Sequence, residues 1–215
     1  MAAGGRSVPI RAVVFDVGGV LETTPTTGWQ ARWEARLGLE SGEIDARLHD
    51  VYRAGSIGAV TLAEAEVQIS ARLGLDPEQL ASVMDELWSE YLGTLNVPLH
   101  DWFRACRPRY KTGILSNSWV GAREREHARY AFGDLCDTVV YSHEEGIEKP
   151  DPRFYAIVCE RLGVQPEEVV FLDDVRVNIT AARALGMHGV LFTGDTPETL
   201  AELAALLERS TVHDV

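Results

Sequence analysis

The sequence predicts an α/β fold, in which a parallel sheet core is interrupted by a long helical insert. Two observations lead to this prediction. Short apolar runs alternate with segments of helical periodicity from about residue 108 onwards. Between residues 22 and 107, helical spacing dominates and no strand pattern stands out. A chain of 215 residues suits one large domain with a smaller domain inserted in it.

The first strand is expected at about residues 10–16, where the apolar run AVVF leads into Asp16. A run this apolar is typical of a strand that is buried on both faces. Gly18 and Gly19 follow, and glycines end a strand and let backbone amides approach a ligand closely. Ligands bind at the carboxyl ends of strands in open α/β sheets, so Asp16 is a candidate nucleophile or metal ligand.

The insert shows apolar stripes at helical spacing. Ile44, Leu48 and Val51 follow one another at i, i+4 and i+7, which is typical of a buried helix face. Asp76 followed by Pro77 indicates an N-cap with proline at the first helical position. Residues 53–56 are expected to form a loop between helices and are candidates for substrate contact.

After the insert, apolar runs and helical patterns alternate. Strands are expected at residues 112–116, 138–141, 169–172 and 189–192. Helices are expected at about 121–131, 152–162, 177–185 and 197–208. This alternation implies a Rossmann-like parallel sheet with right-handed crossovers.

Composition limits the partners and the compartment. The net charge of −13 disfavours a nucleic-acid partner, and any phosphate site must be built locally from a lysine, amides and a cation. Cys106, Cys136 and Cys159 are widely spaced, which favours reduced core thiols over a disulfide framework or zinc site. We see no signal-peptide form and no run long enough to span a bilayer, so we expect a cytoplasmic protein. The oligomeric state is not readable.

Three further segments place polar residues after apolar runs or before a helix. Residues 114–118 read ILSNS, residues 148–152 read EKPDP, and residues 169–174 read VVFLDD. The last of these ends in Asp173 and Asp174, with Asn178 four residues further on. Two adjacent acids at the end of a strand are electrostatically unfavourable unless a cation is present, which favours a metal site.

With the segment around Asp16, these are four ordered motifs, and together they resemble those of the haloacid dehalogenase (HAD) superfamily of hydrolases. The resemblance extends from about residue 13 to about residue 192. It points to the phosphatase-like branch with a helical C1-type cap. The implied Rossmann-like catalytic core comprises residues 8–21 and 108–215, and the implied helical cap comprises residues 22–107.

The resemblance implies a Mg²⁺-dependent phosphohydrolase that acts on a small phosphate ester through an aspartyl-phosphate. Asp16 would attack phosphorus, because a carboxylate is ionised at neutral pH and its acyl phosphate is easily hydrolysed. Ser116 would donate a hydrogen bond to a phosphoryl oxygen, and Lys149 would neutralise charge on the nucleophile and the phosphoryl group. Gly19 and Asn117 are further candidates for substrate binding.

The same resemblance implies the metal ligands. Asp16, the backbone carbonyl of Gly18, Asp173 and Asp174 would hold Mg²⁺, with Asp174 as the direct ligand of the acidic pair. Asn178 would orient this pair. Gly18 is also a candidate for substrate binding through its backbone.

Gly18 stands where phosphatases of this group carry a second Asp, which protonates the leaving group and then activates water. General acid–base help is worth about 10²–10⁴-fold, so its absence leaves three functions open. The first is a phosphatase that does without this Asp, on a good leaving group such as a sugar anomeric phosphate. The second is a catalytically weak phosphate-binding or regulatory protein. The third is a 2-haloacid dehalogenase, against which the retained Asp173 and Asp174 argue. A compact cap further suggests a small metabolite, such as a sugar phosphate.

Overall fold

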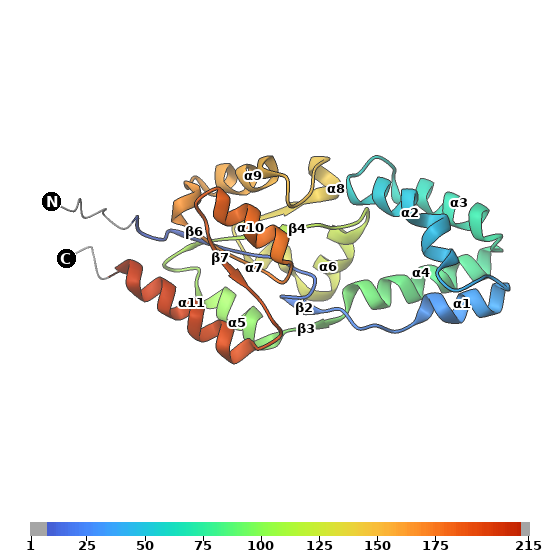
Figure 1. The fold of residues 1–215 in the computed structure, drawn as a ribbon, viewed down its shortest axis with the longest axis horizontal. Helices are drawn as coiled ribbons and strands as arrows, with labels where there is room; N and C mark the ends of the chain where they lie inside the picture. The colour runs from blue at the N-terminus through green and yellow to red at the C-terminus, as the bar shows by residue number, and fades with distance from the viewer. Residues whose placement is uncertain (1–7, 212–215) are drawn as a thin grey trace.

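The structure is a computed structural model that describes residues 8–211 of the chain. A five-stranded parallel sheet has the strand order β5-β4-β1-β6-β7. These strands are β1 (Ala12–Phe15), β4 (Lys111–Ser116), β5 (Thr138–Tyr141), β6 (Val169–Asp173) and β7 (His188–Leu191). Figure 1 shows this sheet between helices, with the helices of the insert gathered at one end of the molecule. The predicted α/β fold is confirmed.

The strand order reverses at β1. The chain runs outward from β1 to β4 and β5, then crosses back and adds β6 on the other side of β1. Ligands bind at such a switch point, outside the carboxyl ends of the strands. Asp16 and Asp173 stand at this edge, after β1 and at the end of β6.

Helices cover both faces of the sheet. They are α5 (Val97–Ala105), α6 (Ala122–Tyr130), α7 (Phe132–Leu135), α8 (Ser142–Glu145), α9 (Pro152–Leu162), α10 (Arg176–Ala184) and α11 (Thr196–Thr211). Because side chains alternate along β1, Val13 and Phe15 join the apolar cluster on one face. Ala12 and Val14 join the cluster on the other. This two-sided burial explains the continuous apolar run in the sequence.

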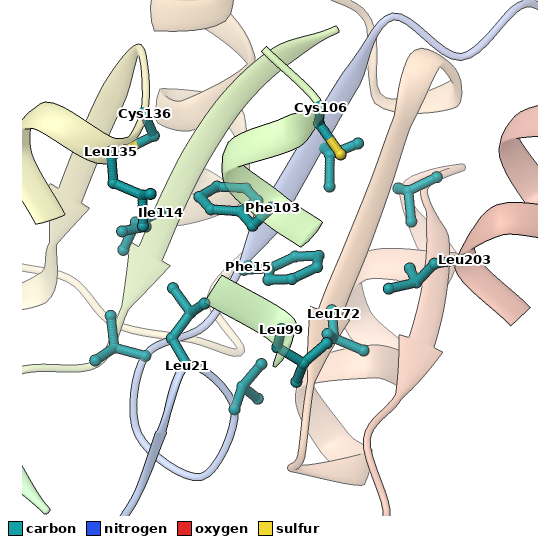
Figure 2. Close-up of a cluster of buried hydrophobic side chains, with 14 of the residues drawn as sticks. Phe15, Leu21, Leu99, Phe103, Cys106, Ile114, Leu135, Cys136, Leu172 and Leu203 are labelled. Carbon is teal, nitrogen blue, oxygen red and sulfur yellow. The ribbon is translucent and has the colours of Figure 1, made fainter. Parts of the chain in front are cut away.

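Helix α5 packs on the core sheet, although the sequence placed residues 97–105 in the cap. Phe103 stacks on Phe15 with ring centroids 4.7 Å apart, and Leu99 is fully buried in the same cluster (Figure 2). An apolar stripe predicts a buried face but not the element that buries it. The division at residues 22 and 107 stays a prediction, and this packing favours a boundary before α5.

The insert is formed by α1 (Trp29–Leu37), α2 (Glu43–Ser56), α3 (Leu62–Leu73) and α4 (Pro77–Leu92). Its apolar core contains the stripe predicted from Ile44, Leu48 and Val51, and it extends to Trp119 and Val120 of the loop after β4. Asp76 caps α4, and its side chain accepts a hydrogen bond from the backbone N–H of Gln79. The insert is therefore packed against the core loop that follows Ser116.

Three local predictions differ from the structure. Residues 53–56 form the last turn of α2 and not a loop. Residues 22–107 also contain two short strands, β2 (Glu22–Thr23) and β3 (Thr94–Leu95), which pair antiparallel where the chain enters and leaves the insert. Strands of two residues are too short to show an apolar alternation in the sequence. The first strand is also shorter than expected, at residues 12–15 instead of 10–16.

Candidate active site

Lys149 lies between two predicted acidic residues. Its Nζ is 2.8 Å from Oδ2 of Asp16 and 2.7 Å from Oδ2 of Asp173. Asp16 and Asp173 meet because β1 and β6 are parallel neighbours, so their carboxyl ends share one edge of the sheet. The Lys149 side chain is fully buried at this point. Three motifs separated in the sequence therefore form one ion-paired cluster.

Asp173 is held by several protein donors. The Nδ2 group of Asn178 lies 3.1 Å from each carboxylate oxygen, and the Val175 N–H donates to Oδ1 at 2.7 Å. Lys149 takes the remaining place on Oδ2. These bonds agree with the predicted orienting role of Asn178, at Asp173. Both carboxylate oxygens of Asp173 therefore already accept hydrogen bonds from the protein.

Asp174 has a different environment from its neighbour. Its side chain is exposed, and it lies directly against Gly19. Gly19 has a φ of 74°, and a Cβ at this position would overlap the Asp174 carboxylate. Glycine is thus required here both for the left-handed backbone and for the space. This freedom favours Asp174 over Asp173 as the direct metal ligand, which stays a prediction.

The site has more negative charge than its lysine can balance. Oxygens of Asp16, Asp173 and Asp174 all lie within 4.8 Å of one another. Burial raises the pKa of Asp16 to about 7; Lys149 lowers this pKa and Asp173 raises it. Burial and Asp173 also raise the pKa of Asp174. Three hard carboxylate donors with a single ammonium fit a divalent cation, which would favour their ionised forms.

Ser116 and Asn117 end strand β4, next to β1. Ser116 is buried, at 2% exposure, on the strand that pairs with β1. The Asn117 side chain bonds both main-chain groups of Lys149: Nδ2 donates to the carbonyl at 3.0 Å, and Oδ1 accepts from the N–H at 2.7 Å. Asn117 therefore holds the Lys149 segment in place. Substrate binding by Asn117 stays a prediction.

Gly18 has room for a side chain. It is outside the left-handed region, and a Cβ there would lie 3.8 Å from Oε1 of Glu22, an ordinary contact. Its departure from the phosphatase pattern is therefore not imposed by backbone conformation or by crowding at Cβ. The backbone of Gly18 also forms an isolated bridge with Glu22.

Sequence reasoning missed a pair of buried acids beside the site. Burial raises the pKa of Glu22 to about 8, and the nearby Glu126 raises it further. Burial likewise raises the pKa of Glu126 to about 7, while the Tyr141 hydroxyl donates to it and opposes this shift. Only Thr24 is seen to donate to Glu22, at 3.1 Å, within the described residues. No local pattern could have paired residues 104 positions apart.

Contacts between α2 and the core fix the insert near the site. The Ser142 hydroxyl donates to the Ser56 carbonyl at 2.7 Å and accepts from the Ser118 N–H at 2.9 Å. Ser118 Oγ lies 2.6 Å from Nδ1 of His143. A cavity of about 390 Å³ lies at this contact, between the insert and the loop after β4. A second cavity, of about 740 Å³, lies beside Gly19 and Asp174.

Known proteins resemble this chain over most of its length. The family model of haloacid dehalogenase-like hydrolases matches residues 10–186. The chain is 32% identical to acyl-CoA dehydrogenase family member 10 of Mus musculus, over 95% of this chain and 20% of that protein. It is 29% identical to phosphatase MT3486 of Mycobacterium tuberculosis, over 93% of this chain and 97% of that protein. The chain thus spans a fifth of the first relative and nearly all of the second.

A solved structure shares the fold. A HAD family enzyme of Bacteroides thetaiotaomicron, crystallised with magnesium and inorganic phosphate, has a TM-score of 0.75 and 22% identity. The match covers 89% of this chain and 98% of that chain. Within the described residues, no helix has the length and apolar character needed to cross a membrane. All three cysteines are free and buried, as predicted.

Proposed function

The chain belongs to the haloacid dehalogenase-like hydrolase family, and we propose that it is a Mg²⁺-dependent phosphohydrolase that acts on a small phosphate ester through an aspartyl-phosphate. The phosphatase name of the mycobacterial relative supports this branch of the family. The magnesium and phosphate held by the similar Bacteroides enzyme support the same chemistry.

The position of Lys149 between Asp16 and Asp173 is the observation that carries this proposal. A buried ammonium beside a buried carboxylate is placed to offset charge when a phosphoryl group joins that carboxylate. Asp16 is also held from its other side, because Oδ1 accepts a hydrogen bond from the Val17 N–H at 2.8 Å. The orientation of the proposed nucleophile is therefore set before substrate binds.

In the proposed reaction, a carboxylate oxygen of Asp16 attacks phosphorus. The bond from phosphorus to the leaving oxygen breaks, and the leaving alcohol takes its proton from water. Water then attacks the phosphorus of the aspartyl-phosphate, which releases inorganic phosphate and restores Asp16. Lys149 stabilises the negative charge in both steps, and Ser116 and the amides near Gly19 donate to the phosphoryl oxygens.

The acidic residues would hold the metal. Asp16, the Gly18 carbonyl and Asp174 are the proposed direct ligands, and Asp173 is proposed to act mainly by fixing Lys149. Bound Mg²⁺ would supply positive charge that a single ammonium cannot. This division follows from the bonds that already occupy Asp173, compared with the open position of Asp174.

Gly18 sets the expected strength of the activity. Without a second Asp, this chain has no side chain at that position to protonate the leaving group. Esters whose alcohols leave easily should therefore be hydrolysed faster than simple alkyl esters. The ratio of these two rates should be larger than in an enzyme that has a general acid.

Phosphate release from a panel of small esters tests the proposal, with and without Mg²⁺, for the wild type and Asp16→Asn. We expect release that depends on Mg²⁺ and is lost in the variant. Mg²⁺ binding without release from any ester would instead favour a phosphate-binding role. Release that persists in a correctly folded Asp16→Asn variant would contradict the proposed nucleophile.

A further inference from the structure

An apolar cavity of about 390 Å³ lies between the insert and the loop after β4. Its apolar lining consists of Trp29, Tyr52, Leu87, Tyr91 and Trp119. Cavities of this size, lined by aromatic side chains, are typical of small-molecule sites. We propose that this cavity binds the body of the phosphate ester, so that the substrate is the phosphate monoester of an apolar, uncharged alcohol. The inference rests on the proposed function.

The aromatic wall is built before any ligand binds. Trp119 packs edge-on to Tyr52 at 6.3 Å between ring centroids and lies 5.7 Å from Trp88, which in turn contacts Tyr91. Gly55 of α2 accommodates this arrangement, because a Cβ there would overlap the Trp119 ring. The rings therefore support one another, and an apolar ligand meets a surface that need not be ordered on binding.

Three of the polar side chains that line the cavity, those of Ser56, Asn117 and Ser118, already have partners. The Ser56 hydroxyl lies 3.0 Å from the Arg53 carbonyl and 3.1 Å from Oε2 of Glu148. Ser118 bonds His143, and Asn117 bonds the main chain of Lys149. A polyol placed here would give up hydrogen bonds to water and find few to replace them.

Two further lining residues, Thr24 and Glu90, lead to the same conclusion. Thr24 donates to Glu22, and Oε2 of Glu90 accepts from the backbone N–H of Thr27 at 2.7 Å. Sugars also stack on aromatic rings, but their hydroxyl groups then need partners at the ring edge. Among the described lining residues, the Gln30 amide, the Tyr52 hydroxyl and Nε1 of Trp119 have no hydrogen-bond partner. The Tyr52 and Trp119 atoms are buried, so a ligand in the cavity would meet the Gln30 amide and not these two groups.

Charge restricts the ligand further. No lysine or arginine is among the described residues that line this cavity, and the one charged group is the Glu90 carboxylate. A second phosphate or a carboxylate on the body of the substrate would find no counter-charge there. The anionic part of the substrate is therefore limited to the phosphoryl group.

The cavity is lined by the chain segment that directly follows the proposed phosphoryl-binding residue Ser116. Asn117 and Ser118, both in its lining, directly follow Ser116 in the chain. Asn117 also bonds the backbone of Lys149, whose ammonium pairs with Asp16. An ester with its phosphoryl group at Asp16 can thus extend past Asn117 into the aromatic cavity. This result differs from the sugar phosphate expected from the sequence, because the lining residues come from segments between residues 24 and 119 and share no local pattern.

Two phosphate esters and one acyl phosphate test the inference. 2-Phenylethyl phosphate and a pentitol 5-phosphate are both esters of primary alcohols but differ in polarity, whereas acetyl phosphate is too small to fill the cavity. We expect kcat/KM to be at least about tenfold higher for the phenylethyl ester than for the pentitol ester, mainly through KM. Equal values, or a preference for the pentitol ester, would overturn the inference.

A pair of variants on α4 tests the location. Leu87 lines the cavity, whereas Leu80 faces a different part of the surface; both are partly buried against the core of the insert. Leu87→Gln should lower kcat/KM for the phenylethyl ester by roughly tenfold and leave acetyl phosphate within about threefold. Leu80→Gln should change neither by more than about threefold. Equal effects of the two variants on the phenylethyl ester would overturn the assignment of this cavity.

Binding separates this inference from the proposed function. If even acetyl phosphate releases no phosphate, the proposed function fails. Non-hydrolysable phosphonate analogues of the phenylethyl ester and of the pentitol ester can then be used. Calorimetry in the presence of Mg²⁺ compares their binding affinities. Tighter binding of the phenylethane phosphonate would still support the cavity assignment, and tighter binding of the pentitol phosphonate would overturn it.

Discussion

The ammonium nitrogen of Lys149 lies 2.8 Å from a carboxylate oxygen of Asp16, and both groups are buried. The same nitrogen lies 2.7 Å from Asp173. One buried ammonium group thus offsets the negative charge of two buried carboxylates. The stability of the core and the chemistry proposed for Asp16 both depend on this lysine.

Lys149→Met should remove activity and weaken the fold. Deleting one partner of a buried ion pair leaves uncompensated charge, which costs about 3–5 kcal/mol in the free energy of unfolding. The loss should be larger at pH 8 than at pH 5, because burial raises the pKa of Asp16 to about 7 and protonation of this carboxyl at low pH relieves the uncompensated charge. Urea unfolding at both pH values measures this. Lys111→Met, at an exposed position on β4, is the matched control and should stay near the wild type.

Gly19→Ala should weaken Mg²⁺ binding. The new Cβ would overlap the Asp174 carboxylate and would require a left-handed backbone, so the proposed ligand must move. We expect the Mg²⁺ concentration for half-maximal activity to rise by about 10–100-fold. Gly18→Ala is the control, because its Cβ has space and its backbone is outside the left-handed region. Equal Mg²⁺ dependence in the two variants would argue against Asp174 as a ligand.

Gly18→Asp should restore a general acid. The position accepts a Cβ, and the neighbouring Glu22 already has a raised pKa of about 8, so like-charge repulsion would favour a proton on one of the two acids. We expect turnover on simple alkyl esters to rise by about 10–100-fold, with little change for acetyl phosphate. Unchanged rates on alkyl esters, in a variant that folds and binds Mg²⁺, would show that leaving-group protonation does not limit the enzyme.

Glu126→Gln should change how stability depends on pH. Burial raises the pKa of Glu126 from 4.5 to about 7, so the folded chain holds this proton more tightly than the unfolded chain. In the wild type, this group therefore lowers stability progressively as pH rises from about 4.5 to about 7. Glutamine does not titrate and keeps an acceptor for Tyr141. The variant should gain about 1–3 kcal/mol relative to the wild type between pH 5 and pH 8, measured by urea unfolding. A parallel pH dependence in the two proteins would mean that Glu126 is ionised when buried.

The sequence predicted that the residues of the candidate site lie together where this follows from local patterns. Asp16, Ser116 and Asp173 each end a buried strand, and parallel strands bring their carboxyl ends together. The order of the motifs then placed Lys149 with them. The burial of Val13 and Phe15 on one face of β1 likewise follows from a continuous apolar run.

Features that depend on pairs of distant residues could not be predicted. The bond between Asn117 and the backbone of Lys149 joins residues 32 positions apart. Three other features also depend on residues far apart in the sequence: the Glu22 and Glu126 pair, the packing of Phe103 on Phe15, and the aromatic cavity. A local pattern gives the buried face of an element but not its partner, so the cavity proposed to bind substrate could be found only in the folded chain.

Trapping the covalent intermediate tests the central claim most directly. The enzyme would be mixed with acetyl phosphate and Mg²⁺, quenched in acid within one turnover, digested and examined by mass spectrometry. We predict a phosphoryl group on Asp16 that forms only with Mg²⁺, decays at the rate of phosphate release, and is absent in Asp16→Asn. Phosphate release during the same turnover, with no phosphorylated Asp16 and with full activity in Asp16→Asn, would contradict the claim.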